Sequence, residues 1–190
     1  MVADGFILVH GGYKNLLSYK KAQIIYDATV YFTRRFFRKG DRTVDQMVQA
    51  ARSGKQNIIE GSMASGTSKE TEVKLTNVAR ASLEELMEDY RDFLRVNAFH
   101  EWPVEHPYVK RLRQINRATV ADYEAFRKGI EHENPEICAN VILGLIRVCS
   151  YLLERQLYRL EQEFIEHGGL RERMIQARLH HRGKGPSTIL

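Results

Sequence analysis

The chain has 190 residues, 43% of them hydrophobic and 28% charged, and a formal net charge of +5. This length suits one domain with its own core, and the composition excludes disordered and collagen-like proteins. No apolar run approaches the roughly 18 residues of a membrane span, and the N-terminus lacks the features of a leader peptide, so we expect a cytoplasmic protein without a membrane partner.

Residues 1–15 form an N-terminal extension, and we expect a first helix over residues 16–38. Small and apolar side chains recur there every three or four residues, which is the period of a helix with one buried face. These residues are Ser18, Ala22, Ile25, Thr29, Phe32 and Phe36. Gly40 and Asp41 end this helix.

A second helix keeps a strict three-and-four spacing through residues 43–65, which is typical of a helix packed nearly antiparallel to a neighbour. Gly54 and Gly61 lie in this seam. Glycine inside a helix costs about 1 kcal/mol relative to alanine, so both positions require a compensating reason. We expect close helix packing there, with aromatic side chains of the first helix, such as Phe32 and Phe36, filling the space.

A third helix is expected to start near Ser68 and to run to Asn97. Thr67 and Glu70 have the spacing of a capping box, in which each side chain accepts a hydrogen bond at the helix start. Its buried face is predicted to use Thr76, Ala79, Leu83, Leu86, Tyr90 and Phe93.

The last long helix is expected to begin at Asn134 and Pro135, which have the character of an N-cap and a first-turn proline, and to end at Gly168. Between the third helix and this one, residues 104–131 show a weaker helical pattern and are interpreted as an accessory helical insertion. Residues 170–190 form a basic C-terminal tail with a short helix. The sequence thus predicts an all-α fold, an antiparallel up-and-down four-helix bundle over residues 16–169.

Cys138 and Cys149 are the two cysteines of the chain. They lie in one predicted helix, about 16 Å apart at about 1.5 Å per residue, which is too far for a disulfide between them. We interpret both as buried thiols of a protein from a reducing compartment.

Basic residues gather near the end of the first helix and continue into the second. The candidate nucleic-acid contacts are Arg34, Arg35, Arg38, Lys39, Arg42, Arg52 and Lys55. Such a cluster suits phosphate groups or an acidic partner surface, although an ordinary solvated helix face has the same composition.

The other face of the second helix is polar but mostly uncharged. It consists of Gln46, Gln49, Ser53, Gln56 and Asn57. Amides and hydroxyls form directional hydrogen bonds without the desolvation cost of a charge, so this face suits an oligomer contact, a protein partner or a nucleic-acid backbone. A plain exposed face is the alternative.

Motifs of catalysis are missing from the sequence. It has no Glu-x-x-His pair of a di-metal bundle, no Cys-x-x-Cys pair, no phosphate-cradling glycine loop and no G-x-S-x-G elbow. We therefore expect a protein that is not an enzyme and has neither a cofactor nor a metal.

One stretch, QNIIEGSMASGTSKE followed by VARASLEEL, resembles a known family. Its characteristic residues are Asn57, Glu60 and Gly61 at the end of the second helix, Ser68, Lys69 and Glu70 at the start of the third, and then Ala79, Ser82, Leu83, Glu84 and Leu86. The match is similar to the four-helix-bundle proteins encoded in intervening sequences of bacterial 23S ribosomal RNA genes. Within them, the chain resembles the longer branch called four helix bundle suffix domain proteins.

This resemblance implies an antiparallel four-helix bundle that assembles as a homopentamer. It also implies a relation to accessory proteins of diversity-generating retroelements, which are basic and bind nucleic acid. The residues at 104–131 and the basic tail lie outside the common core of the family. Two functions stay open, an oligomeric scaffold that binds RNA or DNA and a protein-interaction adaptor without a nucleic-acid role.

Overall fold

The computed structural model describes residues 11–118 and 122–183, and the regular structure of these residues is entirely helical. The expected all-α fold is confirmed. A short 3-10 turn, Tyr13–Asn15, precedes α1 (Leu17–Phe36), α2 (Arg42–Ala64), α3 (Lys69–Val96), α4 (Pro107–Ala118), α5 (Tyr123–Ile130), α6 (Pro135–His167) and α7 (Leu170–Gly183). The expected extension over 1–15 and tail over 170–190 lie partly outside the described residues.

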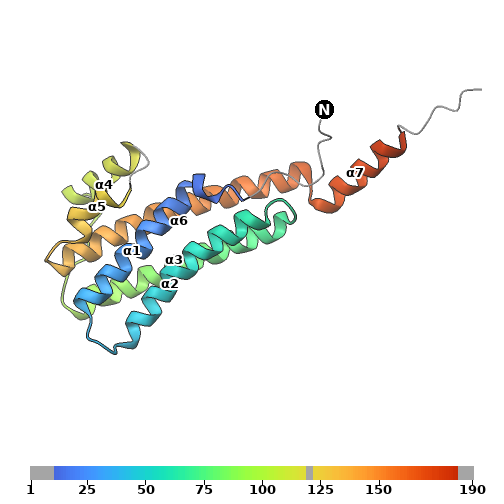
Figure 1. Cartoon of the computed structure of the whole chain (residues 1–190). Helices are drawn as coiled ribbons and strands as arrows, with labels where there is room; N and C mark the ends of the chain where they lie inside the picture. Colours follow the sequence, from blue (N-terminus) through green and yellow to red (C-terminus); the bar gives the residue numbers. More distant parts are fainter. Residues whose placement is uncertain (1–10, 119–121, 184–190) are drawn as a thin grey trace, which may run out of the picture.

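The four long helices form a bundle in which α1 and α3 each pack against both α2 and α6 (Figure 1). Ser18, near the start of α1, donates a hydrogen bond of 3.1 Å to Gln156 near the end of α6. Lys69, at the start of α3, likewise lies 2.9 Å from Glu163 near the end of α6. Both helices are therefore antiparallel to α6. The short turns on either side of α2 reverse the chain twice, so α2 is antiparallel to α1 and α3.

The helix boundaries follow from local hydrogen bonds. Asp41 caps α2 by accepting from the backbone N–H of Thr43 at 2.9 Å, and Asn134 caps α6 in the same way. The capping box expected for α3 is wrong in one detail, because Ser68 and not Thr67 is the N-cap; its hydroxyl accepts from the N–H of residue 71. The hydroxyl of Thr67 instead donates to the carbonyl of residue 64, one turn back.

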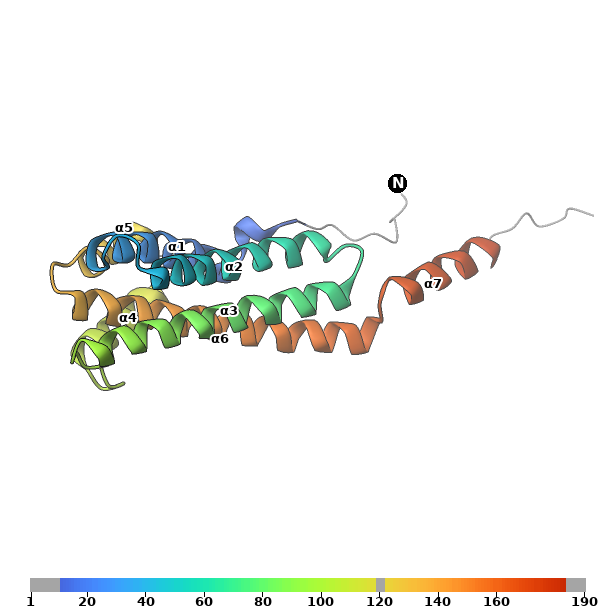
Figure 2. The ribbon, with the colours of Figure 1, turned by 90° about the horizontal axis from the view of Figure 1, so that it is seen from below.

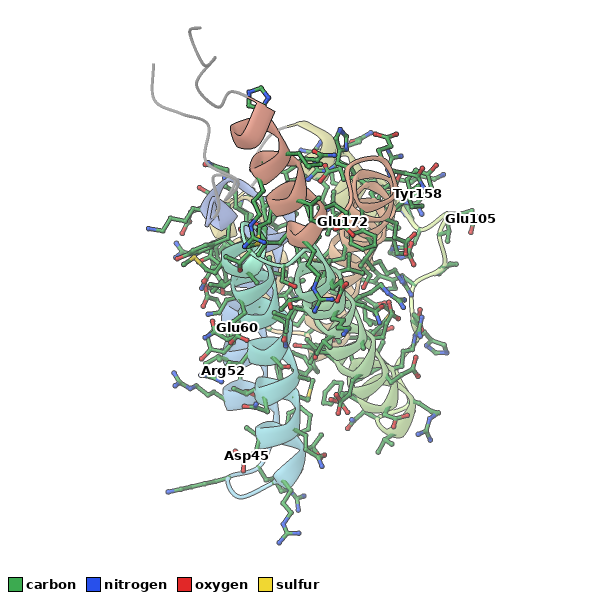
Figure 3. The ribbon with its side chains drawn as sticks, turned by 90° about the vertical axis from the view of Figure 1, so that its right-hand side faces the viewer. Asp45, Arg52, Glu60, Glu105, Tyr158 and Glu172 are labelled. Carbon is green, nitrogen blue, oxygen red and sulfur yellow. The ribbon has the colours of Figure 1, made fainter. Side chains whose placement is uncertain are left out.

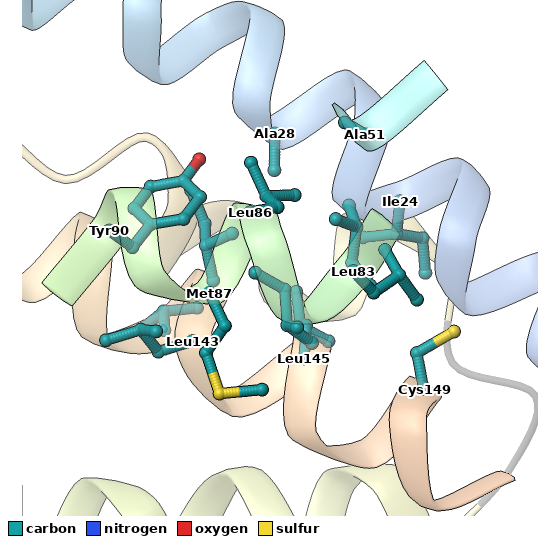
Figure 4. Packing of buried hydrophobic residues seen from close by; sticks show 14 of the residues in the cluster. Ile24, Ala28, Ala51, Leu83, Leu86, Met87, Tyr90, Leu143, Leu145 and Cys149 are labelled. Atoms are coloured by element: carbon teal, nitrogen blue, oxygen red, sulfur yellow. The ribbon is translucent and has the colours of Figure 1, made fainter. Parts of the chain in front are cut away.

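The core runs along the inside of the four long helices (Figure 4). The buried face of α3 presents Leu83, Leu86 and Tyr90 to Ile24 and Ala28 of α1. These side chains are at most 4% exposed. Burial of large apolar side chains, each stabilising by about 1.5–3 kcal/mol, is the main force that holds the helices together.

The insertion completes this core instead of standing apart from it. Phe126 and Ile130 of α5 are 2% and 0% exposed and belong to the same cluster of buried residues. Gly129 permits the close approach of α5 to α6, because a Cβ atom there would lie 2.8 Å from a methyl group of Val141. The loop before α4 is held by Asn140, whose Oδ1 accepts from the backbone N–H of Trp102 at 2.7 Å.

Helix α6 is the central element of the molecule and the most apolar. By length and composition, α6 together with α7 could cross a membrane, contrary to the expectation that the chain has no such stretch. However, 61% of its most apolar window is buried inside the bundle, as the central helix of a packed domain requires. Gly168, with a φ of +64°, ends α6, and α7 then extends beyond the bundle (Figure 2).

Candidate nucleic-acid and partner surfaces

Gly54 and Gly61 are both buried on the side of α2 that packs against α3. A Cβ atom at position 54 would lie 2.9 Å from Leu83 Cδ2, whereas one at position 61 would lie 3.4 Å from Leu75 Cβ. The expectation that aromatic residues of the first helix fill this space is therefore wrong: α3 is the close neighbour. The tight contact is at Gly54, because a Cβ atom at Gly61 meets only ordinary van der Waals distances.

The basic cluster at the α1–α2 turn is exposed. It consists of Arg34, Arg35, Arg38, Lys39 and Arg42, and we call these five residues the turn cluster. Within the described residues, none of the five lies within 4.0 Å of a carboxylate oxygen. Their charges are therefore accessible to an external anion.

Arg52 and Lys55 lie further along α2, apart from the turn cluster. Arg52 is exposed, about 15 Å from Arg42 at about 1.5 Å per helical residue. The Lys55 ammonium sits 4.1 Å from the centre of the Tyr26 ring, a cation–π contact that holds it against α1. The structure thus divides the seven predicted nucleic-acid contacts into a compact group of five and two residues in the middle of α2.

Acidic residues of α3 lie next to the turn cluster. A hollow of about 560 Å³ between the turn and the end of α3 is lined by Arg38 together with Asp41, Asp89 and Asp92. Burial and the neighbouring carboxylates of Glu85 and Asp92 raise the pKa of Asp89. Cations therefore surround this end of the bundle at its rim, while the hollow itself is acidic and would repel phosphate.

The polar face of α2 borders a shallow groove of about 690 Å³ between α2 and α3. Three of its five residues, Gln46, Gln49 and Ser53, line this groove, together with Asp45, Ala50, Val48, Ser82 and Glu85. The hydroxyls of Ser53 and Ser82 share a hydrogen bond of 3.0 Å across it. The charged residues of the groove are both acids, so it suits a protein surface better than a phosphate backbone.

Gln56 and Asn57, the other two residues of that face, are half-buried and lie outside the groove lining. The Asn57 amide donates to the backbone oxygen of Ser53 at 2.9 Å, and its hydrogen-bonding capacity is thus partly used within α2.

Ion pairs connect α3 to α6 at both ends of the bundle. Burial alone would lower the pKa of Lys69, but hydrogen bonds to Glu163 and Glu72 outweigh it and raise the pKa. The same contact with Lys69 lowers the pKa of Glu163. At the other end, Glu101 pairs with Arg147 of α6 and, at 3.2 Å, with Arg91 of α3.

Two thiols and one lysine in the interior have shifted pKa values. Both thiols are free and buried, as expected, and burial raises the pKa of Cys138 to about 11 and that of Cys149 to about 12. Lys21 is only 5% exposed, and its ammonium lies 4.7 Å from the centre of the Phe126 ring. Desolvation lowers the pKa of this lysine. Buried thiols with raised pKa values, such as Cys138 and Cys149, are poor nucleophiles.

The outward side of α6, where three large side chains recur every seven residues, was not predicted from the sequence. Tyr151, Tyr158 and Ile165 are 56%, 65% and 74% exposed. Figure 3 shows Tyr158 on α6 and Arg52 of α2 on opposite sides of the bundle, so this face is separate from the predicted site. The signal was present in the sequence as two tyrosines with helical spacing outside the buried stripe.

Two hollows flank Tyr151 and Tyr158 along α6. The first, of about 560 Å³, lies under α4 and is lined by Trp102, Val109, Leu112, Val148 and Tyr151 and by the polar Glu101, Arg113, Asn116 and Arg147. The second, of about 520 Å³, lies beside the start of α1 and is lined by Leu16, Leu17, Leu152 and Tyr158 and by the polar Ser18, Arg155, Gln156, Arg159 and Gln162. We call this surface the α6 face.

The described part of the chain contains no group of three histidine, cysteine or carboxylate side chains that could hold a metal ion. In comparisons with family models, curated proteins and solved structures, no significant match to this chain was found.

Proposed function

We propose that this chain is a non-enzymatic, oligomeric helical-bundle protein of the cytoplasm that binds nucleic acid through the turn cluster. The observation that carries the proposal is the exposure of five cations within residues 34–42, none of them paired with an acid of the described residues. Unpaired surface cations attract a polyanion strongly, because each phosphate contact releases condensed counterions. The resemblance to the bundle proteins of 23S ribosomal RNA intervening sequences is in keeping with this function.

The oligomer that we propose is a homopentamer, as the same resemblance implies, with the α2–α3 groove as part of the subunit contact. A ring would present the turn cluster several times and convert weak contacts into tight binding. Light scattering of the purified chain tests this directly. A solution mass near five times the chain mass of 22.1 kDa is expected, and a monomer would refute it.

The second candidate is a protein-interaction adaptor without a nucleic-acid role. The acidic lining of the α2–α3 groove favours it, since Asp45 and Glu85 would recognise a basic or polar protein surface. Affinity purification with nuclease treatment separates the two candidates. Partners that survive nuclease favour the adaptor, and partners lost with the nucleic acid favour the first function.

Binding of fluorescent RNA and DNA duplexes at rising salt concentrations tests the role of the turn cluster. Replacing Arg34, Arg35, Arg38 and Lys39 with alanine should weaken binding and reduce the steepness of log K against log salt by up to about 4. A matched control replaces four exposed cations elsewhere, Lys74, Lys110, Lys128 and Arg178, and should change the slope much less. Equal effects of the two variants would show that only net charge matters and would refute a site at the turn.

A further inference from the structure

We infer that the α6 face binds single-stranded nucleic acid, with an unpaired base in the hollow under α4 and further bases stacked on Tyr151 and Tyr158. This inference rests on the proposed nucleic-acid function and deepens it, because it assigns a second surface and a strand class to that function. Three features of the α6 face carry it: charge, exposed aromatic rings and two hollows.

The two hollows carry an excess of positive charge, and one exposed acid, Glu154, lies between Tyr151 and Tyr158 along α6. Four arginines line the two hollows, Arg113 and Arg147 in the first and Arg155 and Arg159 in the second, against the single acid Glu101. Glu101 is already shared between Arg147 and Arg91, and Arg159 lies 3.3 Å from Glu163. Within the described residues, Arg113 and Arg155 have no acid within 4.0 Å. This balance contrasts with the hollow at the turn cluster, where one arginine faces three aspartates.

Aromatic rings are interleaved with these cations. Tyr151 and Tyr158 are seven residues apart on one side of α6, about 10 Å at about 1.5 Å per residue, and more than half of each is exposed. Exposed rings beside arginines are the usual platform for unpaired bases, since every base has a stacking face and every nucleotide a phosphate. In a duplex the faces of the bases are covered by their neighbours, so this platform selects single strands.

The hollow under α4 has the size and chemistry of a pocket for one base. Its volume of about 560 Å³ lies in the range of small-ligand sites, and Trp102 and Tyr151 contribute aromatic rings to its wall. The Asn116 side chain adds a polar group to this wall, and its amide donates to the carbonyl of Leu112 at 3.0 Å.

The face is long enough for several nucleotides. From Gly144 to Gln162, which lie at its two ends, α6 rises about 27 Å at about 1.5 Å per residue.

Fluorescence anisotropy with labelled oligonucleotides tests the inference on the full-length chain. The probes are a single-stranded DNA, a single-stranded RNA of the same sequence, the DNA duplex, and an abasic DNA strand of equal length and charge. The wild-type chain should bind both single strands more tightly than the duplex, and the abasic strand weakly, because the abasic strand keeps the phosphates but loses the stacking. The DNA and RNA arms show whether the sugar matters.

The decisive variant replaces Tyr151 and Tyr158 with alanine, and its matched control replaces both with phenylalanine. Both side chains are exposed, so the fold should be unaffected, which circular dichroism checks. At about 1–3 kcal/mol per stacked base, the alanine variant should lose at least about 30-fold in affinity for single strands and should bind the duplex as the wild type does. The phenylalanine control should stay within about threefold, because its rings still stack.

Failure of this inference is distinguishable from failure of the proposed function. If the alanine variant binds single strands like the wild type while loss of the turn cluster still weakens binding, the α6 face is not the site and the proposed function stands. If no probe binds in either variant or in the wild type, both proposals fail. Quenching of Trp102, the single tryptophan, gives an independent readout, since base entry into its hollow should change its emission.

Discussion

The phenol of Tyr90 in α3 donates a hydrogen bond of 3.1 Å to the Thr29 hydroxyl in α1, and both side chains are 0% exposed. The Thr29 hydroxyl in turn donates to the carbonyl of Ile25 at 2.8 Å. Every polar atom of this pair is thus satisfied inside an apolar core. Burial raises the pKa of Tyr90, so its phenol stays protonated and remains a donor.

Substitution of Tyr90 and substitution of Thr29 should therefore lower the free energy of unfolding by different amounts. Tyr90→Phe removes the donor and should cost about 0.5–1.5 kcal/mol, whereas Thr29→Val strands a buried phenol and should cost about 1–3 kcal/mol. In urea unfolding, the double variant should cost less than the sum of the single ones. Tyr158→Phe is a control on an exposed ring and should change nothing. Strict additivity would contradict the coupling.

The two glycines of the α2 seam should respond differently to alanine. At Gly54 the new methyl group meets Leu83 at 2.9 Å, and the overpacking cost of about 1–3 kcal/mol should exceed the gain of about 1 kcal/mol in helix propensity. At Gly61 the nearest atom is 3.4 Å away, so the gain should dominate. Thermal or urea unfolding should rank Gly61→Ala above wild type and Gly54→Ala below it, and the reverse order would be inconsistent with the packing.

Lys21 destabilises the folded state, and its substitution by an apolar residue should therefore increase stability. The cation–π contact with Phe126 stabilises the fold by about 0.5–2 kcal/mol. Burying a charged or unpaired polar group costs more free energy than this contact contributes. Lys21→Met should therefore stabilise the fold by about 1–3 kcal/mol near neutral pH. Leu17→Met, a change at an exposed position, is the control.

The pH dependence of this effect has a defined sign. The pKa of Lys21 is lower in the folded chain than its ordinary value of 10.5, so the unfolded chain binds more protons between the two values. The free energy of unfolding of the wild-type chain therefore rises with pH across that window, as the folded-state penalty of the Lys21 charge is lost. It stops rising above 10.5. The advantage of Lys21→Met should shrink as the pH is raised into this window, and an advantage that grows with pH would oppose the assignment.

Asn140 should control the loop that forms one wall of the hollow under α4. Besides accepting from Trp102, its amide donates to the carbonyls of His100 and Glu136, both at 2.9 Å. Asn140→Ala should cost about 1–3 kcal/mol and shift Trp102 emission to longer wavelength as water enters. The exposed Asn97→Ala serves as control, and emission unchanged in Asn140→Ala would mean that the loop is held by other contacts.

Much of the fold is predictable from the sequence, because the helical period reports directly which residues are buried. Six residues were expected on the buried face of the first helix. Five of them, Ser18, Ala22, Ile25, Thr29 and Phe32, are buried, and Phe36 is half-buried. The period does not report which neighbour covers a face, because that depends on residues distant in the chain. For this reason the partner of the glycine seam was assigned to the first helix and not to α3.

The candidate surfaces were less predictable for a related reason. The cations of the turn cluster are adjacent in sequence, so their grouping could be predicted, but two of the three aspartates beside Arg38, Asp89 and Asp92, come from α3. The α6 face needs residues from α4, α6 and the start of α1, which only the fold brings together. Tyr151 and Tyr158 carried the one local signal, their seven-residue spacing.

The docking of α5 over Lys21 has a consequence for how the molecule fluctuates. Phe126 and Ile130 seal one flank of the core, and Lys21 lies beneath Phe126. Any transient detachment of α5 exposes apolar surface, which opposes it, but also hydrates the ammonium group, which favours it. A plain four-helix bundle lacks α5. In this chain α5 covers a charged group whose hydration favours the detachment of α5, and α5 is therefore a natural unit of partial opening.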